Sequence, residues 1–248
     1  MNKHSGLENA LARAAQLAEL VWQPAAGLTV NNKGYYQRAP ETGSTKPVRG
    51  VPYSSVRVED KFIGRDIRLT TFLSALDNAR GVLYTRDTSN PEDAAYHAEI
   101  RNTYLYYGTV CSAFVNYALA LPMHRSTHEF CCAPEFYPIP LQDADGLALC
   151  DAPVTTRSEG YPSCGGVATG GHVRLITGLE RDGSGKVTTV EITEGCPPVV
   201  KRTRYTAEEF NATLRGNNGS YVVYRYRQLD SVPAPESVES RRVGGIMC

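Results

Sequence analysis

The sequence predicts an α+β fold in which helices come first and an antiparallel sheet follows. Apolar residues recur at helical spacing in three segments of the first half, and again in a fourth helix that begins at Cys111. From His172 onward the pattern changes to alternating strands joined by a Gly-rich turn. Helices followed by strands, without regular alternation of the two, are typical of an α+β plan.

The helices of the first half have recognisable ends. Ser5 and Glu8 form a capping box at the start of the first helix. The second helix is followed by Gly81 as a C-cap, and its apolar stripe consists of Leu69, Phe72, Leu73 and Leu76. A short strand is expected at 82–84, and an Asn-Pro pair at 90–91 starts the third helix.

The second half reads as strands with one further helix. Residues 172–179 and 187–194 have strand-like composition, and an Asp-Gly-Ser-Gly run between them predicts a hairpin loop. Thr206 and Glu209 cap a short helix, and residues 221–226 alternate like a last strand.

We expect one domain over residues 1–229, followed by a poorly ordered tail over 230–248 that is rich in Pro, Ser and Glu. Residues 1–50 form an extension made of the first helix and a long loop. Residues 122–171 have many Pro, Gly, Asp and Cys residues and no sustained period. A segment of that kind is expected as a long insertion beside a substrate cleft.

Composition and charge narrow the class of protein. The chain has 248 residues, of which 42% are hydrophobic and 21% charged, as in ordinary globular proteins. Lys and Arg together number 26, and so do Asp and Glu, so there is no general attraction for nucleic acid or an anionic membrane. No apolar run approaches the roughly 20 residues of a transmembrane helix. We therefore expect neither a nucleic-acid partner nor an integral membrane segment.

The N-terminus and the cysteines leave the compartment open. Glu8 and Arg13 interrupt any apolar segment that a signal peptide would need. The protein is therefore cytoplasmic, or an export signal has been removed and it works in the cell envelope or outside the cell. Seven cysteines are an odd number without a C-x-x-C pair, so at least one lies outside intramolecular disulfides.

Cys111 is the candidate nucleophile. Gly108 delivers it to the first position of an amphipathic helix, which Pro122 stops. A helix N-terminus favours the thiolate, and its N–H groups stabilise an oxyanion. From this stretch alone a small buried residue at a helix start is an equally good interpretation, so a base elsewhere must decide.

His172 is the candidate base among five histidines. It opens a strand, and a strand-end histidine bonded to solvent is the alternative interpretation. If Glu180 closes the hairpin loop opposite Lys186, the same register places His172 opposite Glu194 and points Glu191 to the other face. That register supplies a carboxylate to orient the histidine, and a slip of one residue would remove it.

These motifs resemble the papain-like bacterial cell-wall peptidases, namely the NlpC-type family and the related cysteine, histidine-dependent amidohydrolases/peptidases. The resemblance lies in a Gly-preceded Cys-Ser-x-Phe-Val within 107–119 and a Gly-His-Val strand within 170–194. Gly50-Val51-Pro52-Tyr53 is similar to the family's Gly-x-Pro-Tyr segment. The resemblance implies a papain-like fold, with the cysteine helix packed on a small antiparallel sheet. It also implies cleavage of a peptide or amide bond in peptidoglycan without cofactor or metal.

The resemblance also implies residue roles. Cys111 is the nucleophile, His172 the base and Glu194 the orienting residue. Tyr53 lies beside the thiolate, and the backbone N–H groups of Cys111 and Ser112 contribute to the oxyanion hole. The residue before the cysteine is valine, where the family often has aspartate. A glutamate as third residue is closer to the amidohydrolase/peptidase branch than to the NlpC-type members.

The sequence allows three other interpretations of its functional residues. Two histidines and two cysteines within 124–132 resemble a zinc site that Cys150 or Cys164 would complete. Adjacent cysteines seldom share an ion, so we expect buried or paired cysteines and no metal. The same fold also serves a non-catalytic cell-wall-binding module or an acyl- or lipid-handling transferase. A cytoplasmic cysteine protease or transglutaminase-like enzyme is the third. The presence of Cys, His and Glu favours an enzyme, but does not separate hydrolysis from acyl transfer.

Overall fold

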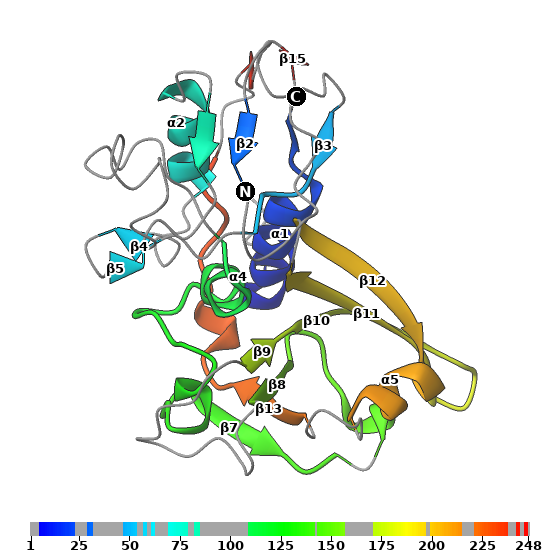
Figure 1. The fold of residues 1–248 in the computed structure, drawn as a ribbon. Coiled ribbons are helices and arrows are strands. Elements are labelled where there is room, and N and C mark those ends of the chain that lie inside the picture. Colours follow the sequence, from blue (N-terminus) through cyan, green and yellow to red (C-terminus); the bar gives the residue numbers. More distant parts are fainter. Residues whose placement is uncertain are drawn as a thin grey trace. The chain divides into compact units, whose positions relative to one another are not determined.

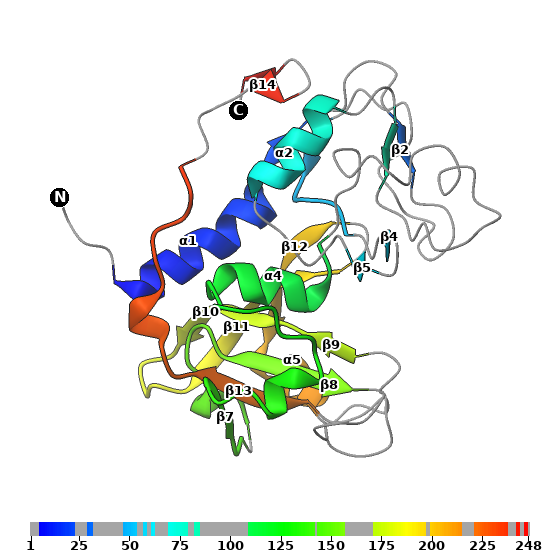
Figure 2. The ribbon, with the colours of Figure 1, turned by 90° about the vertical axis from the view of Figure 1, so that its left-hand side faces the viewer.

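The structure, a computed structural model, describes residues 5–22, 29–31, 47–53, 57–58, 61–62, 69–78, 82–84, 109–141, 143–156, 171–196, 199–214, 221–237, 242–243 and 246–247. These residues form helices and small, mostly antiparallel sheets, so the predicted α+β class is confirmed (Figure 1, Figure 2). The described α-helices are α1 (Gly6–Glu19), α2 (Leu69–Asn78), α4 (Cys111–Ala118) and α5 (Ala207–Leu214). The described 3-10 turns are η3 (Glu129–Cys131), η4 (Ala144–Gly146) and η5 (Leu229–Ser231).

The strands are short, and most come from the second half of the chain. Those before α4 are β1 (Val21–Trp22), β2 (Thr29–Asn31), β3 (Val48–Arg49), β4 (Arg57–Val58), β5 (Lys61–Phe62) and β6 (Val82–Tyr84). Those between α4 and α5 are β7 (Phe136–Ile139), β8 (Ala152–Thr156), β9 (Gly171–Val173), β10 (Leu175–Arg181), β11 (Val187–Gly195) and β12 (Val200–Thr206). The last are β13 (Val222–Tyr226), β14 (Arg242–Val243) and β15 (Ile246–Met247).

The chain forms two compact units. The first takes its residues from 1–14, 115–194 and 202–235, and the second from 15–114, 195–201 and 236–248. Both units draw on segments from the beginning, middle and end of the chain. The single domain expected over 1–229 stays a prediction.

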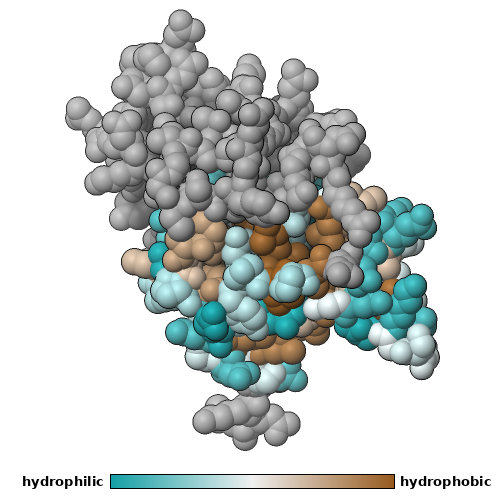
Figure 3. All heavy atoms as spheres, turned by 90° about the horizontal axis from the view of Figure 1, so that it is seen from below, coloured by the Kyte–Doolittle hydropathy of each residue, from teal (hydrophilic) through white to brown (hydrophobic). Residues whose placement is uncertain are grey.

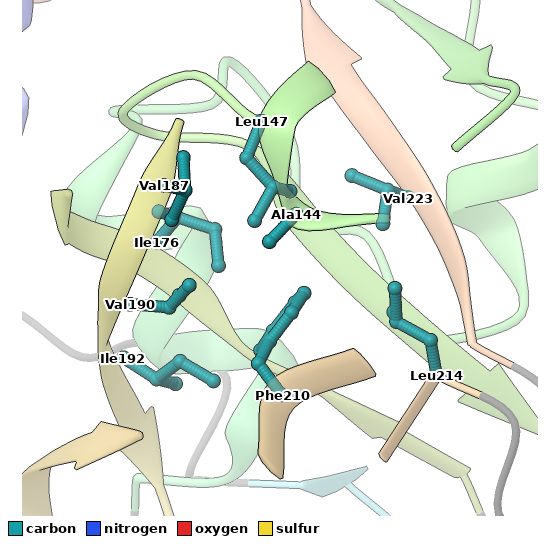
Figure 4. Packing of buried hydrophobic residues seen from close by; sticks show 9 residues of the cluster. All are labelled: Ala144, Leu147, Ile176, Val187, Val190, Ile192, Phe210, Leu214 and Val223. Atoms are coloured by element: carbon teal, nitrogen blue, oxygen red, sulfur yellow. The ribbon is translucent and has the colours of Figure 1, made fainter. Parts of the chain in front are cut away.

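The first unit contains two antiparallel sheets. One has four strands in the order β7-β13-β8-β9, and the other has three in the order β10-β11-β12. Apolar side chains of β10, β11, β13 and α5 meet in one buried cluster (Figure 4). Phe210 of α5 is fully buried there beside Val190 and Ile192, which occupy alternate positions of β11 and therefore share a face. Burying a side chain of this size stabilises the fold by about 1.5–3 kcal/mol.

Two predicted helix starts are confirmed by their caps. In α1 the N–H of Ser5 donates to Glu8 Oε2 at 2.7 Å, and the N–H of Glu8 donates to Ser5 Oγ at 3.2 Å. In α5 the N–H of Thr206 donates to Glu209 Oε2 at 2.8 Å, and the N–H of Glu209 returns a bond of 3.2 Å to the threonine hydroxyl. Each reciprocal pair satisfies N–H groups that a helix start cannot pair internally.

The second unit has small strand pairs and α2. Trp22 is 1% exposed, donates from Nε1 to the carbonyl of Gly50 at 3.0 Å, and meets Phe72 of α2 edge-on at 5.4 Å between ring centroids. The predicted helix from Leu69 is confirmed as α2, and the predicted strand at 82–84 is β6, which pairs in parallel with β2. The third predicted helix, beginning at 90–91, lies outside the described residues.

The segment 122–171 was expected to be a long insertion without regular structure, and its described part is different. It supplies β7 and β8, which are neighbours of β13 in the four-stranded sheet. Pro138 and Pro153 hid both strands from pattern analysis, because proline is depleted in strands. Pro138 lies on the edge strand β7, and the partner strand β9 ends beside Pro153, so neither position needs a full ladder of N–H donors.

Residues 230–237, the start of the expected tail, carry hydrogen-bond acceptors for α1. Asn9 Nδ2 donates to the carbonyl of Val232 at 2.8 Å, and Gln16 Nε2 donates to the carbonyl of Glu236 at 2.8 Å. Val232 is 4% exposed. These contacts are made by backbone carbonyls, which composition does not reveal.

The described surface is mixed. Seen from below, its hydrophobic residues gather near the centre and its hydrophilic residues lie around them (Figure 3). Among the described residues, Met123 is the large hydrophobic side chain that is most exposed, at 56%. None of the described helices is both long and apolar enough to cross a membrane.

Candidate active site

His172 lies in β9, at the edge of the four-stranded sheet. It pairs with Thr155 of β8. The ladder ends just after it, because the N–H of Arg174 donates to the carbonyl of Pro153 at 3.0 Å and the chain continues as β10 in the other sheet. The predicted continuous strand over 172–179 is therefore wrong, since these residues form two strands in different sheets.

The β10–β11 hairpin also has a register other than the predicted one. Leu175 pairs with Thr193, whereas the predicted register placed it opposite Glu191, two residues earlier. β10 extends to Arg181, so the loop begins one residue later than predicted. Within the loop the side chain of Asp182 accepts a hydrogen bond of 3.1 Å from the N–H of Lys186. Two irregularities in the ladder change the register further along the hairpin.

His172 and Glu194 nevertheless lie together. Nε2 of the histidine is 2.6 Å from Oε2 of the glutamate, and the two side chains are 27% and 8% exposed. Glu194 continues the buried face of β11 that begins with Val190 and Ile192. The expected contact between the histidine and the carboxylate is confirmed, but it joins strands of two sheets and does not form across a hairpin.

This contact determines which nitrogen of His172 can act as a base. An ionised carboxylate only accepts hydrogen bonds, so Nε2 must carry the proton when it bonds Glu194. In the neutral ring the other nitrogen, Nδ1, then holds the lone pair. The pair is therefore built to present Nδ1 as the proton acceptor.

Arg174 is a third member of this group. Its Nε lies 3.6 Å from the same oxygen of Glu194 that contacts the histidine. Its Nη2 donates to the hydroxyl of Tyr221 at 2.7 Å, and the guanidinium lies 4.4 Å from the centre of that ring. Nε and Nη1 are buried and make no hydrogen bond to any residue that the structure describes. The arginine is thus a mostly buried cation placed against the carboxylate.

Arg174 was not predicted as a site residue, although one signal for it was present in the sequence. Arg174 follows His172 by two positions, and side chains two apart in extended chain point to the same face. Tyr221 offered no comparable signal, since it precedes β13 and reaches the arginine only through the fold.

Cys111 is the first residue of α4, as predicted, and is 6% exposed. The hydrogen-bond ladder of the helix begins with the N–H of Phe114 donating to the carbonyl of Val110 at 2.9 Å. Ser112 follows at the second position and is 5% exposed. The helix ends at Ala118, before the predicted stop at Pro122, and Ala120 then takes a left-handed φ of +50°.

Gly195 packs directly on the start of α4. A Cβ on this glycine would lie 3.1 Å from the carbonyl oxygen of Val110 and 3.3 Å from Cα of Cys111, both backbone atoms. A side chain at this position would crowd these atoms, so glycine suits the close approach. Because Gly195 directly follows Glu194 in β11, one strand carries both the carboxylate and the surface against which the cysteine's helix packs.

The segment containing Tyr53 meets the chain just before the cysteine. Tyr53 forms a parallel β-bridge with Thr109, two residues before Cys111, and Pro52 forms an antiparallel bridge with Val199. All four of the bridged residues belong to the second unit, as does Cys111, while His172 and Glu194 belong to the first. The Gly-Val-Pro-Tyr segment, which resembles the family's Gly-x-Pro-Tyr segment, therefore lies beside the residues that lead into α4.

The His/Cys-rich segment 124–132 is organised by other contacts. Arg125 forms a two-point ion pair with Glu135, with Nε–Oε1 at 2.7 Å and Nη2–Oε2 at 3.1 Å. The hydroxyl and N–H of Ser126 both bond Glu129 at 2.6 Å, and these bonds lower the pKa of that carboxyl. Within the described part of the chain, no three His, Cys, Asp or Glu side chains gather in a way that could hold a metal ion.

Comparison of the chain with protein-family models, curated proteins and solved structures gave no match. The groups that carry chemistry belong to both units. The first unit holds a histidine bonded to a buried carboxylate and an arginine beside that carboxylate. The second unit holds a buried cysteine at the start of a helix.

Proposed function

We propose that the protein is a cysteine-dependent hydrolase that cleaves a peptide or amide bond through a thioester intermediate. Cys111 is the nucleophile, His172 the general base and acid, and Glu194 the residue that orients the histidine. The observation that carries this proposal is the 2.6 Å contact between Nε2 and the glutamate, because it leaves Nδ1 as the basic nitrogen. A thiol nucleophile needs a neighbouring base that a third polar group holds in position.

The position of Cys111 supports its role. It begins an eight-residue helix, where the backbone N–H groups and the helix dipole favour a thiolate and an oxyanion. Glu194 is covalently joined to the glycine that packs on this helix start. The mechanism requires the Cys111 thiol to face Nδ1 of His172, and the experiments below test that requirement.

The reaction has two steps. The thiolate of Cys111 attacks the carbonyl carbon, and the displaced electron pair forms an oxyanion beside the N–H groups of Cys111 and Ser112. The C–N bond then breaks, and the protonated His172 gives its Nδ1 proton to the leaving amine. Nδ1 next takes a proton from water, whose oxygen attacks the thioester carbon. The acid product leaves, and the cysteine sulfur is released for another cycle.

The resemblance to papain-like cell-wall peptidases supports a substrate class and a fold. The substrate we propose is a peptide or amide bond in peptidoglycan stem peptides, and the proposed arrangement is papain-like. Tyr53 is proposed to contact the substrate or the oxyanion, which its backbone bridge to Thr109 supports. If a nucleophile other than water resolves the thioester, the same residues perform acyl transfer.

Thiol labelling across pH tests the nucleophile. We expect a small electrophile such as iodoacetamide to label Cys111 at mildly acidic pH faster than any other described cysteine, as read by peptide mass mapping. Cys150 is an internal reference, because burial raises the pKa of its thiol to about 12 and it should stay unlabelled. Rapid labelling of a residue that is only 6% exposed would identify an activated thiolate and not simple accessibility.

Two histidine variants make this measurement specific. His172→Ala should abolish the rapid phase at Cys111. His128→Ala is the matched control, because this half-buried histidine precedes η3, and its removal should leave the phase unchanged. Equal labelling of Cys111 in wild type and His172→Ala would refute the proposed pair and favour a binding module.

Turnover is tested with peptidoglycan fragments. Mass spectrometry should show new peptide or amide termini with the wild-type protein and none with Cys111→Ala. If the wild type binds fragments without cleaving them, the hydrolase assignment fails. If it forms a Cys111 acyl adduct that only an added amine or alcohol releases, the protein is an acyltransferase.

A further inference from the structure

Two charged side chains, Glu194 and Arg174, lie beside or near the ring of His172. One carboxylate oxygen, Oε2, is 2.6 Å from Nε2 of His172 and 3.6 Å from Nε of Arg174. The arginine cannot lose its proton, so both groups present positive or potentially positive charge to the same oxygen. The histidine, glutamate and arginine side chains are 27%, 8% and 14% exposed, so water screens these charges only weakly.

An ionised glutamate has a cost as an orienting residue. Its negative charge favours the doubly protonated ring, so it holds the proton that a general acid must give to the leaving group. A neutral amide in the same place would orient the ring without that effect. A cation next to the carboxylate restores near-neutrality while the hydrogen bond to Nε2 stays in place.

We infer that Arg174 is a positioning residue that offsets the charge of Glu194, so that the glutamate orients His172 without trapping a proton on Nδ1. The geometry supports this role. The guanidinium is anchored on its far side by the Nη2 bond to Tyr221 and by stacking on that ring. Among the described residues, its Nε and Nη1 make no hydrogen bond to a competing acceptor.

The neighbouring charged pair lies on the opposite face of β11. Glu191 is 3.3 Å from Nε of Arg202, and it is separated from Glu194 by an odd number of positions along the strand. The charges of this pair therefore compensate each other away from the face that carries Glu194, whereas Arg174 lies against Glu194 itself.

The inference is tested by ¹⁵N NMR of histidine-labelled protein at pH 7, which reports directly whether each ring nitrogen is protonated. Arg174→Met removes the charge but keeps an apolar stem. We expect it to raise the ratio of protonated to unprotonated Nδ1 by about tenfold, the effect of one charge a few ångströms away in a partly buried site. Arg174→Lys keeps the charge and should restore most of the wild-type ratio.

A second pair of variants separates charge compensation from structural damage. Glu194→Gln leaves the arginine unopposed and should shift the ratio in the opposite direction. The double variant Arg174→Met with Glu194→Gln is neutral again and should return close to the wild-type ratio. Arg204→Met is the matched control, because it breaks an exposed ion pair with Glu180 and should not move the His172 signals.

Three results would overturn the inference: an unchanged Nδ1 signal in Arg174→Met, the same shift in Arg174→Lys as in Arg174→Met, or a double variant whose ratio stays as far from wild type as that of Arg174→Met. The functional part of the inference rests on the proposed hydrolase activity, where Arg174→Met should lower kcat and leave KM unchanged. The NMR measurement is repeated in the Cys111→Ala background, where it does not depend on the thiol. Failure of the labelling experiment and failure of this one are therefore distinguishable.

Discussion

The buried ion pair between Asp151 and Arg225 should be a large local contribution to the stability of the first unit. Asp151 is fully buried, and Oδ1 and Oδ2 lie 2.7 Å from Nε and Nη2 of the arginine. Oδ2 also accepts the N–H of Ala148 at 2.8 Å. Replacing Asp151 by Asn removes the charge and turns one acceptor into a donor that faces the guanidinium.

The expected loss in the free energy of unfolding follows from how deeply the ion pair is buried. Removing one partner of a buried pair typically costs 3–5 kcal/mol, and because the arginine side chain is 32% exposed we expect the lower end, about 3 kcal/mol, for Asp151→Asn. Arg225→Met in the Asp151→Asn background should cost less than it does alone, because the buried charge is already gone.

Urea unfolding followed by far-UV circular dichroism measures these differences, and the slope m should not change. The matched control is Arg204→Met, which breaks the exposed pair with Glu180 and should cost less than about 1 kcal/mol. The reasoning is refuted if Asp151→Asn costs no more than this control, or if its effect and that of Arg225→Met are additive.

Two further predictions concern the loop before η3 and the start of α4. Bonds from Ser126 lower the pKa of Glu129, so its ionised form stabilises the fold above the ordinary glutamate pKa, and this contribution is lost as the pH falls through the lowered value. The stability difference between wild type and Glu129→Gln should therefore shrink on acidification in urea unfolding at several pH values, and a constant difference would contradict this. Gly195→Ala should destabilise the protein by about 1–3 kcal/mol, because the new Cβ would lie only 3.1 Å from the carbonyl oxygen of Val110 and 3.3 Å from Cα of Cys111, and it should slow labelling of Cys111. Gly183→Ala has open space around it and serves as the control; equal effects would refute the crowding argument.

The helix starts could be predicted from the sequence, because contacts between residues close in the chain determine them. The Ser5–Glu8 and Thr206–Glu209 boxes fix helix starts through contacts three residues apart, so each could be recognised without tertiary information. The cysteine at the start of α4 was also predicted from local sequence, namely the preceding glycine and the apolar spacing of the residues that follow.

The predictions that were wrong concern the pairing of strands, which depends on residues far apart in the sequence. The strand containing His172 changes sheets at Arg174, and no alternation of residue types marks that point. The hairpin register depends on Asp182 bonding Lys186 within the loop and on ladder irregularities that composition does not encode. The contact between His172 and Glu194 was predicted from the wrong register, so the residues were correct and the reason was not.

The hydrogen bonds between α1 and the residues after β13 have a consequence for synthesis of the chain. Asn9 bonds the carbonyl of Val232, 223 positions later, and both belong to the first unit. The ribosome must therefore release Val232 before this unit can complete its contacts. Until then α1 lacks part of its packing, and contacts between residues this far apart in sequence slow folding and leave apolar surface exposed. Chains that stop before residue 229 would keep both sheets of this unit but lack the carbonyls of Val232 and Glu236 that accept hydrogen bonds from α1.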